Sequence, residues 1–344
     1  MINRKTVYND LTNEDKISKI NEKNKFLIND FLDYLRSIDK AESTIKQYKS
    51  DLHIFFVWNM EKNDNKNFIN ITKREFARFQ GVAINEWNWS PKRTRRVKSV
   101  LSSLSNYIEN MLDEEDEYKD YKSIVKKIEN PTNELVRDKS VFEPDELKHL
   151  LDMLVENKEY EKACCLALAM YSGRRKAELC RFKVSYFDES NVIFGSLYKT
   201  PEKVKTKGRS SKGKLIYLYV LKHPFQPYLD MWLNERNRLH IDSEWLFPDT
   251  ADPTQQVKIS TLNSWARYFT RLIKKPFYFH SMRHFFTTEC VKNNLPTNVI
   301  QEIIDWESAD MVALYTDIST DETLGKYFDE NGIKQIKQTS LSDL

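Results

Sequence analysis

The chain has 344 residues, of which 40% are apolar and 31% are charged, a composition typical of soluble globular proteins and unlike that of disordered or membrane proteins. At about 150 residues per domain, this length predicts two domains. The formal charge of +3 is too small to indicate a polyanionic partner by itself, so evidence for nucleic-acid binding has to come from local clusters of charge.

Three further features narrow the class of protein. The longest apolar run, nine residues from Ala163 to Tyr171, is far short of the roughly 20 needed to span a bilayer, and residues 1–10 lack an apolar signal segment, so we expect a cytoplasmic protein. The four cysteines, at 164, 165, 180 and 290, form no C-x-x-C pair, which favours buried free thiols over disulfides or a zinc site. Only seven residues are glycine, which disfavours phosphate-binding loops and favours helices.

Amphipathic helices dominate the first part of the chain. Apolar residues at helical spacing predict one helix over 26–35, in which Phe26 belongs to the apolar face, and a second that opens at Ser43-Thr44. A third begins with an N-cap and a proline at Ser90-Pro91 and keeps its period to Met111. We therefore expect an N-terminal extension at 1–24, a helical domain at 25–130 and a polar linker at 131–140.

The following domain, expected at 141–318, mixes helices with a short sheet. Glu143-Pro144 precedes one helix, and residues 163–170 form a helix that is buried on most sides. Strand-forming residues at 186–197 and 215–220 predict a small antiparallel sheet. Between them, residues 199–214 carry seven Lys or Arg and one acid, and form its basic hairpin tip. Further helices are expected near 225–239, 260–274, 281–293, 296–304 and 309–316, before a polar tail at 319–344.

Five positive charges and no acid lie at the start of the predicted helix over 91–111. Cations at a helix N-terminus oppose the helix dipole, so helix stability does not account for them. A solvated face and a surface that contacts DNA phosphates account for them equally well. The residues are Lys92, Arg93, Arg95, Arg96 and Lys98.

Two segments resemble known ligand-binding motifs but lack residues that those motifs require. The segment 208–214 resembles a Walker A loop, but Leu215 stands where Ser or Thr would bind magnesium, and a strand follows where a helix is required. His280 and His284 are spaced as metal ligands on a helix, but Arg283 between them would repel a cation and a third ligand is missing, so we expect no metal. The alternatives for His280 and Arg283 are an ordinary capped helix or a pair that grips and deprotonates an anionic group.

Residues 171–179 carry a more specific signal. A buried helix ends at Ser172-Gly173, and the spacing R-x-x-E brings Arg175 and Glu178 onto one helical face. A guanidinium held by a carboxylate makes a clamp for an oxyanion. Farther along the chain, Trp306 precedes Tyr315 by nine residues, and such aromatic residues taken alone are most often part of a core.

The order of these motifs resembles that of one family. S-G-x-R-x-x-E-L at 172–179, a basic β-hairpin, H-x-x-R-H at 280–284, and then Trp306 and Tyr315 are similar in order and spacing to the tyrosine recombinase (phage integrase) family, over essentially all of residues 25–318. The resemblance implies a fold that is mainly α with a small antiparallel β-sheet, in which a helical core-binding domain that binds DNA precedes a mixed α+β catalytic domain.

The resemblance also implies a role for each matching residue. Tyr315 matches the nucleophile, which forms a 3′-phosphotyrosyl link, and the reaction needs no cofactor. Arg175 and Arg283 match the two arginines that neutralise the transition state. His280 matches the residue that helps to deprotonate the tyrosine, whose ordinary pKa near 10 makes it a poor nucleophile at neutral pH.

Three further catalytic positions follow from the same resemblance. Trp306 matches a position held by His or Trp, and its indole N–H can donate to a phosphate oxygen. Glu178 matches the carboxylate of the first motif. Lys207 is our first choice for the lysine that protonates the leaving 5′-oxygen, followed by Lys205 and then by Lys199 or Lys212. With DNA as the ligand, the candidate contacts are Lys92, Arg93, Arg95, Arg96, Lys98, Lys205, Arg209 and Lys212.

The sequence also departs from the family pattern. Arg174 stands where the first motif usually has an apolar residue, Asp305 replaces the glycine before Trp306, and the hairpin is longer than usual. These departures leave the catalytic set intact.

We therefore expect a site-specific DNA recombinase, an integrase or a transposon recombinase, which acts through a 3′-phosphotyrosyl intermediate and a Holliday junction. The implied partners are double-stranded DNA with inverted-repeat core sites, three further copies of the chain in a homotetramer with a dimer at each site, and accessory DNA-bending proteins. A membrane is not among them, and the implied location is the nucleoid. The alternatives are a catalytically inactive DNA-binding regulator derived from a recombinase, and a type IB topoisomerase or telomere resolvase with the same chemistry.

Overall fold

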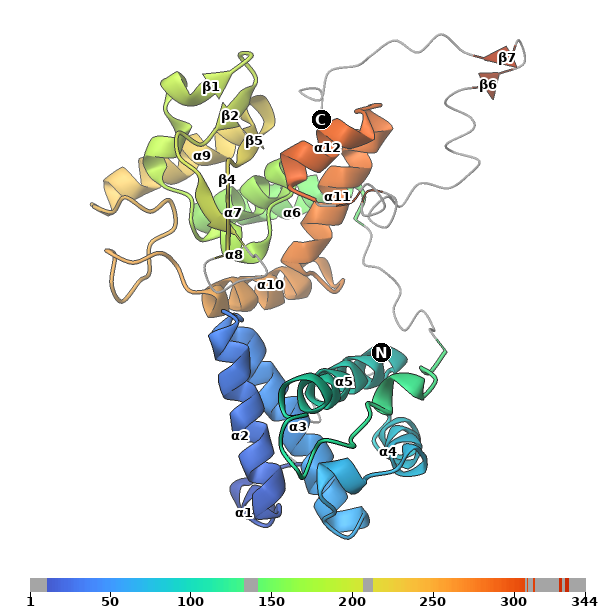
Figure 1. Cartoon of the computed structure of the whole chain (residues 1–344). Coiled ribbons are helices and arrows are strands. Elements are labelled where there is room, and N and C mark those ends of the chain that lie inside the picture. The colour runs from blue at the N-terminus through green and yellow to red at the C-terminus, as the bar shows by residue number, and fades with distance from the viewer. Residues whose placement is uncertain are drawn as a thin grey trace. The chain divides into compact units, whose positions relative to one another are not determined.

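The chain divides into two compact units near residue 138 (Figure 1). The structure, a computed structural model, describes residues 11–132, 142–206, 213–306, 308, 312, 328–329 and 332–333. Each unit has its own hydrophobic core. In the described part of the chain, no helix is long and apolar enough to cross a membrane.

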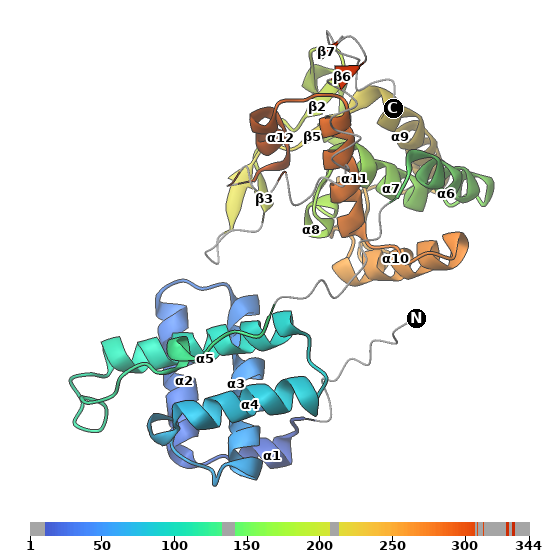
Figure 2. The ribbon, with the colours of Figure 1, turned by 90° about the vertical axis from the view of Figure 1, so that its right-hand side faces the viewer.

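Over residues 11–132, the first unit is built from α-helices and 3₁₀ turns. The pair α2 and α3 is crossed by α4 and α5 (Figure 2). Aromatic side chains fill the space between them: Phe55 is fully buried and stacks on Phe76 with ring centroids 5.2 Å apart. The elements of this unit are α1 (Glu14–Ser18), α2 (Glu22–Ser37), α3 (Glu42–Lys62), α4 (Lys73–Asn85) and α5 (Pro91–Met111), with 3₁₀ turns η1 (Phe68–Asn70) and η2 (Val125–Lys127).

The three helices predicted for this unit are confirmed as α2, α3 and α5. The Ser90 hydroxyl accepts from the Arg93 amide at 3.3 Å and so caps α5, and Pro91 occupies the first helical position. The apolar face predicted for α2 is wrong at one residue. Phe26 was assigned to that face but is 67% exposed, whereas the next residue, Leu27, is buried. A residue five positions before Phe31 points about 140° away from it around the helix, so Phe26 cannot share the face of Phe31.

Helices α1 and α4 and both 3₁₀ turns of the first unit were not predicted. Helix α4 begins with a capping box, in which the side chains of Thr72 and Glu75 each accept from the other residue's backbone amide. Ahead of α2, Ile20 is 1% exposed and belongs to the hydrophobic core of this unit. The packed part of the unit therefore begins within the stretch that the sequence assigns to an N-terminal extension.

The second unit is organised around α7, whose residues from Ala163 to Ser172 are all buried. Helix α7 packs against α6, α9 and α11. Its helices are α6 (Pro144–Glu156), α7 (Tyr160–Ser172), α8 (Lys176–Leu179), α9 (Lys222–Arg238), α10 (Ile259–Ile273), α11 (Phe279–Lys292) and α12 (Thr297–Ile304). These bounds confirm the helices predicted after Glu143, except that the one expected near 309–316 lies almost entirely outside the described residues.

Gly173 ends α7 in the left-handed conformation, with φ of 59°. A Cβ at this position would lie 2.7 Å from Cδ1 of Phe286 on α11. Only glycine therefore fits here, because both the backbone angle and the close approach of α11 exclude a side chain.

The β-structure is smaller than predicted and is divided into pieces. Residues 186–191, predicted as strand, instead form parts of two 3₁₀ turns, η3 (Val184–Phe187) and η4 (Glu189–Asn191). Tyr186 and Phe187 are both buried there, a pattern that alternating strand residues cannot produce on one face.

The strands between residues 192 and 221 form two separate groups. A three-stranded antiparallel sheet has the order β1-β2-β5, and β3 and β4 form a separate antiparallel pair. The strands are β1 (Val192–Ile193), β2 (Leu197–Lys199), β3 (Val204–Thr206), β4 (Lys214–Ile216) and β5 (Tyr219–Leu221), with β6 (Phe328–Asp329) and β7 (Gly332–Ile333) nearer the C-terminus.

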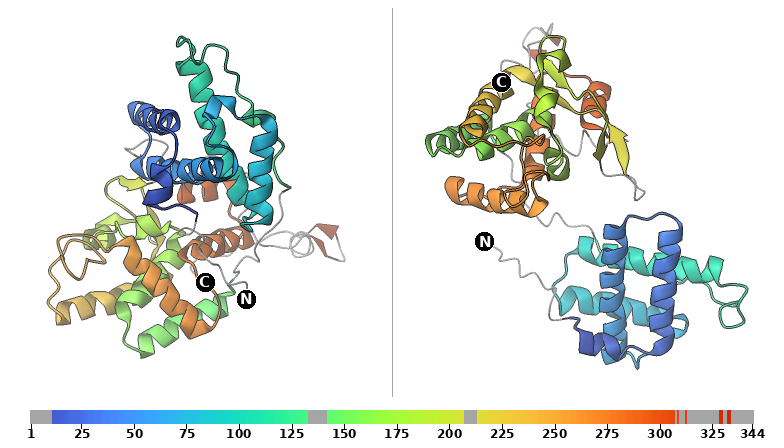
Figure 3. Two further views of the ribbon diagram at one scale, coloured as in Figure 1. Left: turned by 90° about the horizontal axis from the view of Figure 1, so that it is seen from below. Right: turned by 90° about the vertical axis from the view of Figure 1, so that its left-hand side faces the viewer.

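The hairpin formed by β3 and β4 lies beside α12, as seen in Figures 2 and 3. Strand β4 begins at Lys214, the last residue of the segment 208–214 that resembles a Walker A loop. A strand therefore stands where a phosphate-binding loop requires a helix, as the sequence predicted. All four cysteines are buried and free, which confirms the prediction made from their spacing.

Candidate active site

Arg175 is held in place by Glu178. The Arg175 Nη1 atom donates to Glu178 Oε1 at 3.0 Å, and the other carboxylate oxygen accepts from the Arg175 backbone amide, also at 3.0 Å. Glu178 is buried, whereas the Arg175 side chain remains 31% exposed. The pair predicted from the R-x-x-E spacing is therefore present, and it presents a guanidinium to solvent on a fixed support.

Arg283 lies deeper and joins three segments of the chain. It is 1% exposed, its Nη1 atom donates to the Gly173 carbonyl at 3.0 Å, and its Nη2 atom donates to the Ile304 carbonyl at 2.9 Å. Its guanidinium carbon lies 4.9 Å from the centre of the Trp306 ring, within the range of a cation–π interaction. Arg283 therefore ties the end of α7 and the end of α12 to α11, and holds the Trp306 ring against its own guanidinium group.

His280 stands one turn before Arg283 on α11 and is accessible to solvent. Desolvation by the surrounding protein lowers the pKa of His280, and the positive charges of Arg283 and Arg175 lower it further. The lowered pKa favours the neutral imidazole, which is the form that can accept a proton. His280 and Arg283 share α11, and Arg283 donates to the carbonyl of Gly173, two residues before Arg175, so the three residues lie in one region of the unit.

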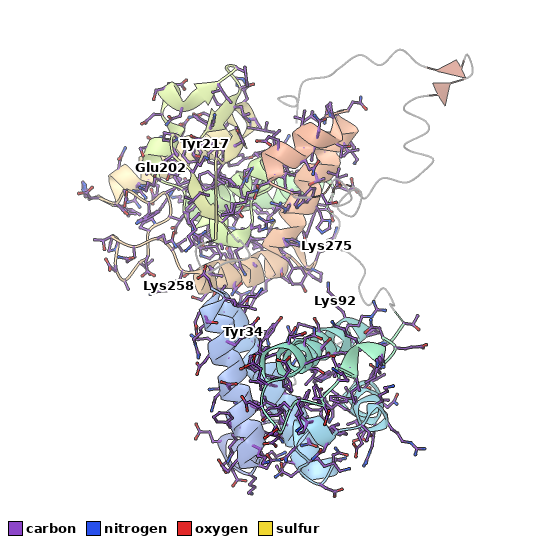
Figure 4. All side chains as sticks on the ribbon, in the orientation of Figure 1. Tyr34, Lys92, Glu202, Tyr217, Lys258 and Lys275 are labelled. Atoms are coloured by element: carbon purple, nitrogen blue, oxygen red, sulfur yellow. The ribbon has the colours of Figure 1, made fainter. Side chains whose placement is uncertain are left out.

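Further basic residues lie on the β3–β4 hairpin and on the separate strand β2, and β3 packs against α8, the helix that follows Arg175. Lys205 is exposed on β3 between the buried Val204 and Thr206. The Nζ atom of Lys199 lies 4.5 Å from the centre of the Tyr217 ring, which is labelled in Figure 4. Four of the residues proposed from the sequence lie outside the described residues: Lys207, Arg209, Lys212 and Tyr315.

The basic cluster at the start of α5 lies in the first unit, where most of its charges have partners within the protein. Arg93 Nη1 lies 2.7 Å from Asp51 Oδ1, and Arg96 Nη2 donates to the same oxygen at 3.0 Å. Burial raises the pKa of Asp51 to about 6, against the opposing charge of Arg96. The solvated-face explanation is therefore incomplete, because two of the five cations enclose a buried carboxylate.

The remaining cations of this cluster differ in their exposure. Arg95 donates to the Pro131 carbonyl through Nε at 3.0 Å and through Nη2 at 2.5 Å, and Lys98 donates to Asn130 Oδ1 at 3.1 Å. Lys92 is exposed in the first turn of the helix (Figure 4), and the described residues offer it no hydrogen-bond partner. Lys92 and the half-exposed Arg96 are thus the cations best placed to meet an external anion.

Sequence reasoning did not assign a function to three residues that the structure brings to the site. Arg174 is fully buried and donates from Nη2 to the Ile303 carbonyl. Lys214 on β4 forms an ion pair with Asp305. Both Arg174 and Asp305 stand where the sequence departs from the family pattern. Those departures could have indicated that the two residues have a role in the site.

A cleft of about 510 Å³ separates the β3–β4 hairpin from α12. Its walls are formed on one side by hairpin residues and on the other by the end of α12 and the turn after it. The lining residues are Lys203, Lys214, Leu215, Ile216, Tyr217, Tyr219, Asn298, Gln301, Glu302, Asp305 and Trp306. The cleft thus opens next to Trp306, with basic side chains at its rim.

Comparison with known proteins identifies both units. The model of the family described as "Phage integrase family" matches residues 140–322, and that described as "Phage integrase, N-terminal SAM-like domain" matches residues 27–115. The SPbeta prophage-derived recombinase-like protein YomM of Bacillus subtilis (strain 168) is 29% identical over 312 residues, which cover 89% of this chain and 88% of that protein. A tyrosine recombinase of Thermosipho africanus (strain TCF52B) is 23% identical over 311 residues, 85% of this chain and 95% of that protein.

Solved structures share the fold at low sequence identity. XerH site-specific recombinase, in a post-cleavage complex with palindromic difH substrate, has a TM-score of 0.60 at 18% identity, over 82% of this chain and 78% of that one. A lambda integrase tetramer bound to a Holliday junction has a TM-score of 0.60 at 15% identity, over 85% of this chain and 77% of that one. Because the integrase family model alone spans more than half of the sequence, the chain belongs to the phage integrase family of tyrosine recombinases.

Proposed function

We propose that this chain is a site-specific recombinase that cuts and rejoins double-stranded DNA through a 3′-phosphotyrosyl intermediate. The observation that carries the proposal is the convergence of Arg175, His280, Arg283 and Trp306 from three segments far apart in the sequence. Two guanidinium groups, a neutral imidazole and an indole N–H form a set suited to a phosphodiester that passes through a doubly negative transition state.

In the proposed reaction, the Tyr315 oxygen attacks the scissile phosphorus while the bond from phosphorus to the 5′-oxygen breaks. The tyrosine proton passes to His280, and a hairpin lysine, Lys207 in our assignment, gives a proton to the departing 5′-oxygen. Arg175 is partly exposed and can bind a non-bridging oxygen of the phosphate, while the buried Arg283 adds positive charge and supports Trp306. Attack by a 5′-hydroxyl on the phosphotyrosyl link reverses these transfers and rejoins the strand.

The partners of this reaction are also part of the proposal. The relatives with solved structures include complexes with a palindromic substrate, with a core site and with a Holliday junction. By analogy, we infer that this chain binds inverted-repeat core sites as a dimer at each site and exchanges strands within a homotetramer. An integrase or transposon recombinase, assisted by accessory DNA-bending proteins, is the role that we infer from the family.

Covalent trapping on nicked DNA tests the proposal. Wild type and Tyr315→Phe are incubated with nicked duplexes drawn from DNA that flanks the gene and contains short inverted repeats, denatured in detergent, and examined for protein that migrates with attached DNA. We expect an adduct from wild type and none from Tyr315→Phe, since the phenyl ring has no oxygen to attack phosphorus. Tyr217→Phe, which removes another tyrosine hydroxyl near the hairpin, is the matched control and should keep the adduct.

Each of the other outcomes of this experiment would favour a different nucleophile or a different function. An adduct from both wild type and Tyr315→Phe means that another residue is the nucleophile. Specific binding by both proteins without any adduct favours a catalytically inactive DNA-binding regulator. Relaxation of supercoiled DNA without sequence preference favours a type IB topoisomerase.

A further inference from the structure

The end of α12 is held by two buried guanidinium groups. Arg174 donates to the carbonyl of Ile303, and Arg283 donates to the carbonyl of Ile304, the last residue of the helix. Free carbonyls at a helix C-terminus carry partial negative charge, and cations stabilise them. Since Trp306 follows two residues later, these contacts fix the position of the turn that carries it.

Asp305 occupies this turn in the left-handed conformation, with φ of 61°. Glycine adopts this conformation at lower cost than aspartate, so an aspartate here suggests that its carboxylate is used. The carboxylate accepts from the Lys214 ammonium of β4, and the Asp305 side chain is 14% exposed. Burial lowers the pKa of Arg174, and the carboxylates of Glu178 and Asp305 oppose that shift. Asp305 thus lies between a buried cation and a hairpin cation.

Lys214 links Asp305 to the hairpin that carries Lys207, the proposed proton donor. It is paired in register with Thr206 of β3, and Lys207 is the next residue after Thr206 in the sequence. Strands β3 and β4 have three residues each, and within the described residues they pair with one another and with no other strand. An isolated two-stranded ribbon is marginally stable in water, so its placement depends on contacts with neighbouring elements. The ion pair between Lys214 and Asp305 spans the cleft between the hairpin and α12.

We propose that Lys214 and Asp305 are positioning residues, which couple the β3–β4 hairpin to the Trp306 turn and thereby set the reach of the hairpin lysine to the leaving 5′-oxygen. This inference rests on the proposed function and adds a role that the proposed catalytic set does not contain. The step concerned is the transfer of one proton from the lysine ammonium to the 5′-oxygen as its bond to phosphorus breaks, which leaves a neutral amine.

A leaving-group substitution isolates that step. Asp305→Asn and Lys214→Gln are compared with wild type on two nicked duplexes, one with the natural 5′-oxygen and one with sulfur in its place. A thiol has a pKa near 8.5, far below the value of about 16 for water, so the sulfur leaves without a proton donor. A general acid contributes about 10²–10⁴-fold to a rate, and loss of its positioning should cost about tenfold on the oxygen substrate. On the sulfur substrate, both variants should cleave at close to the wild-type rate.

Two controls accompany these variants. Glu146→Gln breaks an ion pair of 2.7 Å with Lys275, elsewhere in the same unit (Figure 4), and should cleave both substrates at the wild-type rate. The double variant Asp305→Asn with Lys214→Gln should be no slower than either single variant, because both substitutions remove the same contact. Asp305→Asn conserves shape, and Lys214→Gln alters the opposite partner, so a folding defect in one does not decide the result.

Each result separates the two proposals. Equal losses on the oxygen and sulfur substrates indicate an ordinary structural contact and overturn the coupling, as does a wild-type rate for both variants on the oxygen substrate. If wild type forms no adduct with either substrate, the proposed function fails and the coupling fails with it. Active wild type with variants defective on the oxygen substrate alone supports both.

Discussion

At the scale of single residues, the proposed reaction depends on the charge state of His280. Its surroundings lower the pKa of this histidine below the ordinary value of 6.5, so the neutral form persists to lower pH than in an exposed histidine. A protonated imidazole cannot take the tyrosine proton. Activity should therefore be fully present above pH 6.5 and be lost only as the pH falls through the lowered pKa.

We predict that the rate of adduct formation by wild type is constant from pH 8 to about pH 6.5 and falls below it, in single-turnover assays on the nicked duplex. His280→Gln should be slow throughout and lack this acid limb. DNA binding measured in the same buffers separates catalysis from affinity. An acid limb at or above pH 6.5 would show that His280 is not the group that titrates.

At the scale of elements, α5 combines a solvated face with a charged N-terminus in which Arg93 and Arg96 contact Asp51. This arrangement fixes the guanidinium groups in space, and Lys92 and Arg96 keep access to solvent. A helix whose first turns carry ordered cations can track a DNA backbone if those cations reach phosphates. Salt dependence measures this directly, because each phosphate contact releases counterions.

We predict that Arg95→Ala with Arg96→Ala weakens DNA binding and lowers the slope of log affinity against log salt by up to about 1.8, which is about 0.9 for each lost contact. Lys23→Ala with Lys25→Ala, which removes two cations from α2, is the matched control and should leave the slope unchanged. Because Arg95 also donates to Pro131, urea unfolding has to establish that the variant is folded. An unchanged slope in a folded variant would assign the cluster to a structural role.

At the scale of the whole molecule, the two units carry separate hydrophobic cores, one in residues 11–132 and one in the part of the chain after residue 141. Loss of packing in one core should therefore leave the other core intact.

We predict that Phe55→Ala, which lowers the free energy of unfolding by about 3–5 kcal/mol, increases amide hydrogen exchange within 11–132 and leaves the amides of the second unit protected. Phe269→Ala should give the converse pattern, as both rings are fully buried in their own cores. Loss of protection in both units from either variant would mean that the chain unfolds as one cooperative body.

Local patterns in the sequence determined most of the architecture. The helical period, the Ser90-Pro91 start and the Gly173 end are properties of neighbouring residues, so α5 and α7 were predicted with nearly their observed bounds. The order of the motifs indicated the family, and the R-x-x-E spacing indicated the pair of Arg175 and Glu178. The strand prediction at 186–191 failed because apolar aromatic residues suit a buried 3₁₀ turn as well as a strand.

Only the tertiary structure decided which charged residues are buried and what they contact. Arg174 and the Ile303 carbonyl are 129 residues apart in the sequence, and Lys214 and Asp305 are 91 residues apart. No periodicity or local spacing encodes such contacts, because they arise when α12, the hairpin and the end of α7 pack around a common site. The sequence thus indicated which residues we propose to carry the chemistry, whereas long-range packing decided which residues around them hold the described part of the site in place.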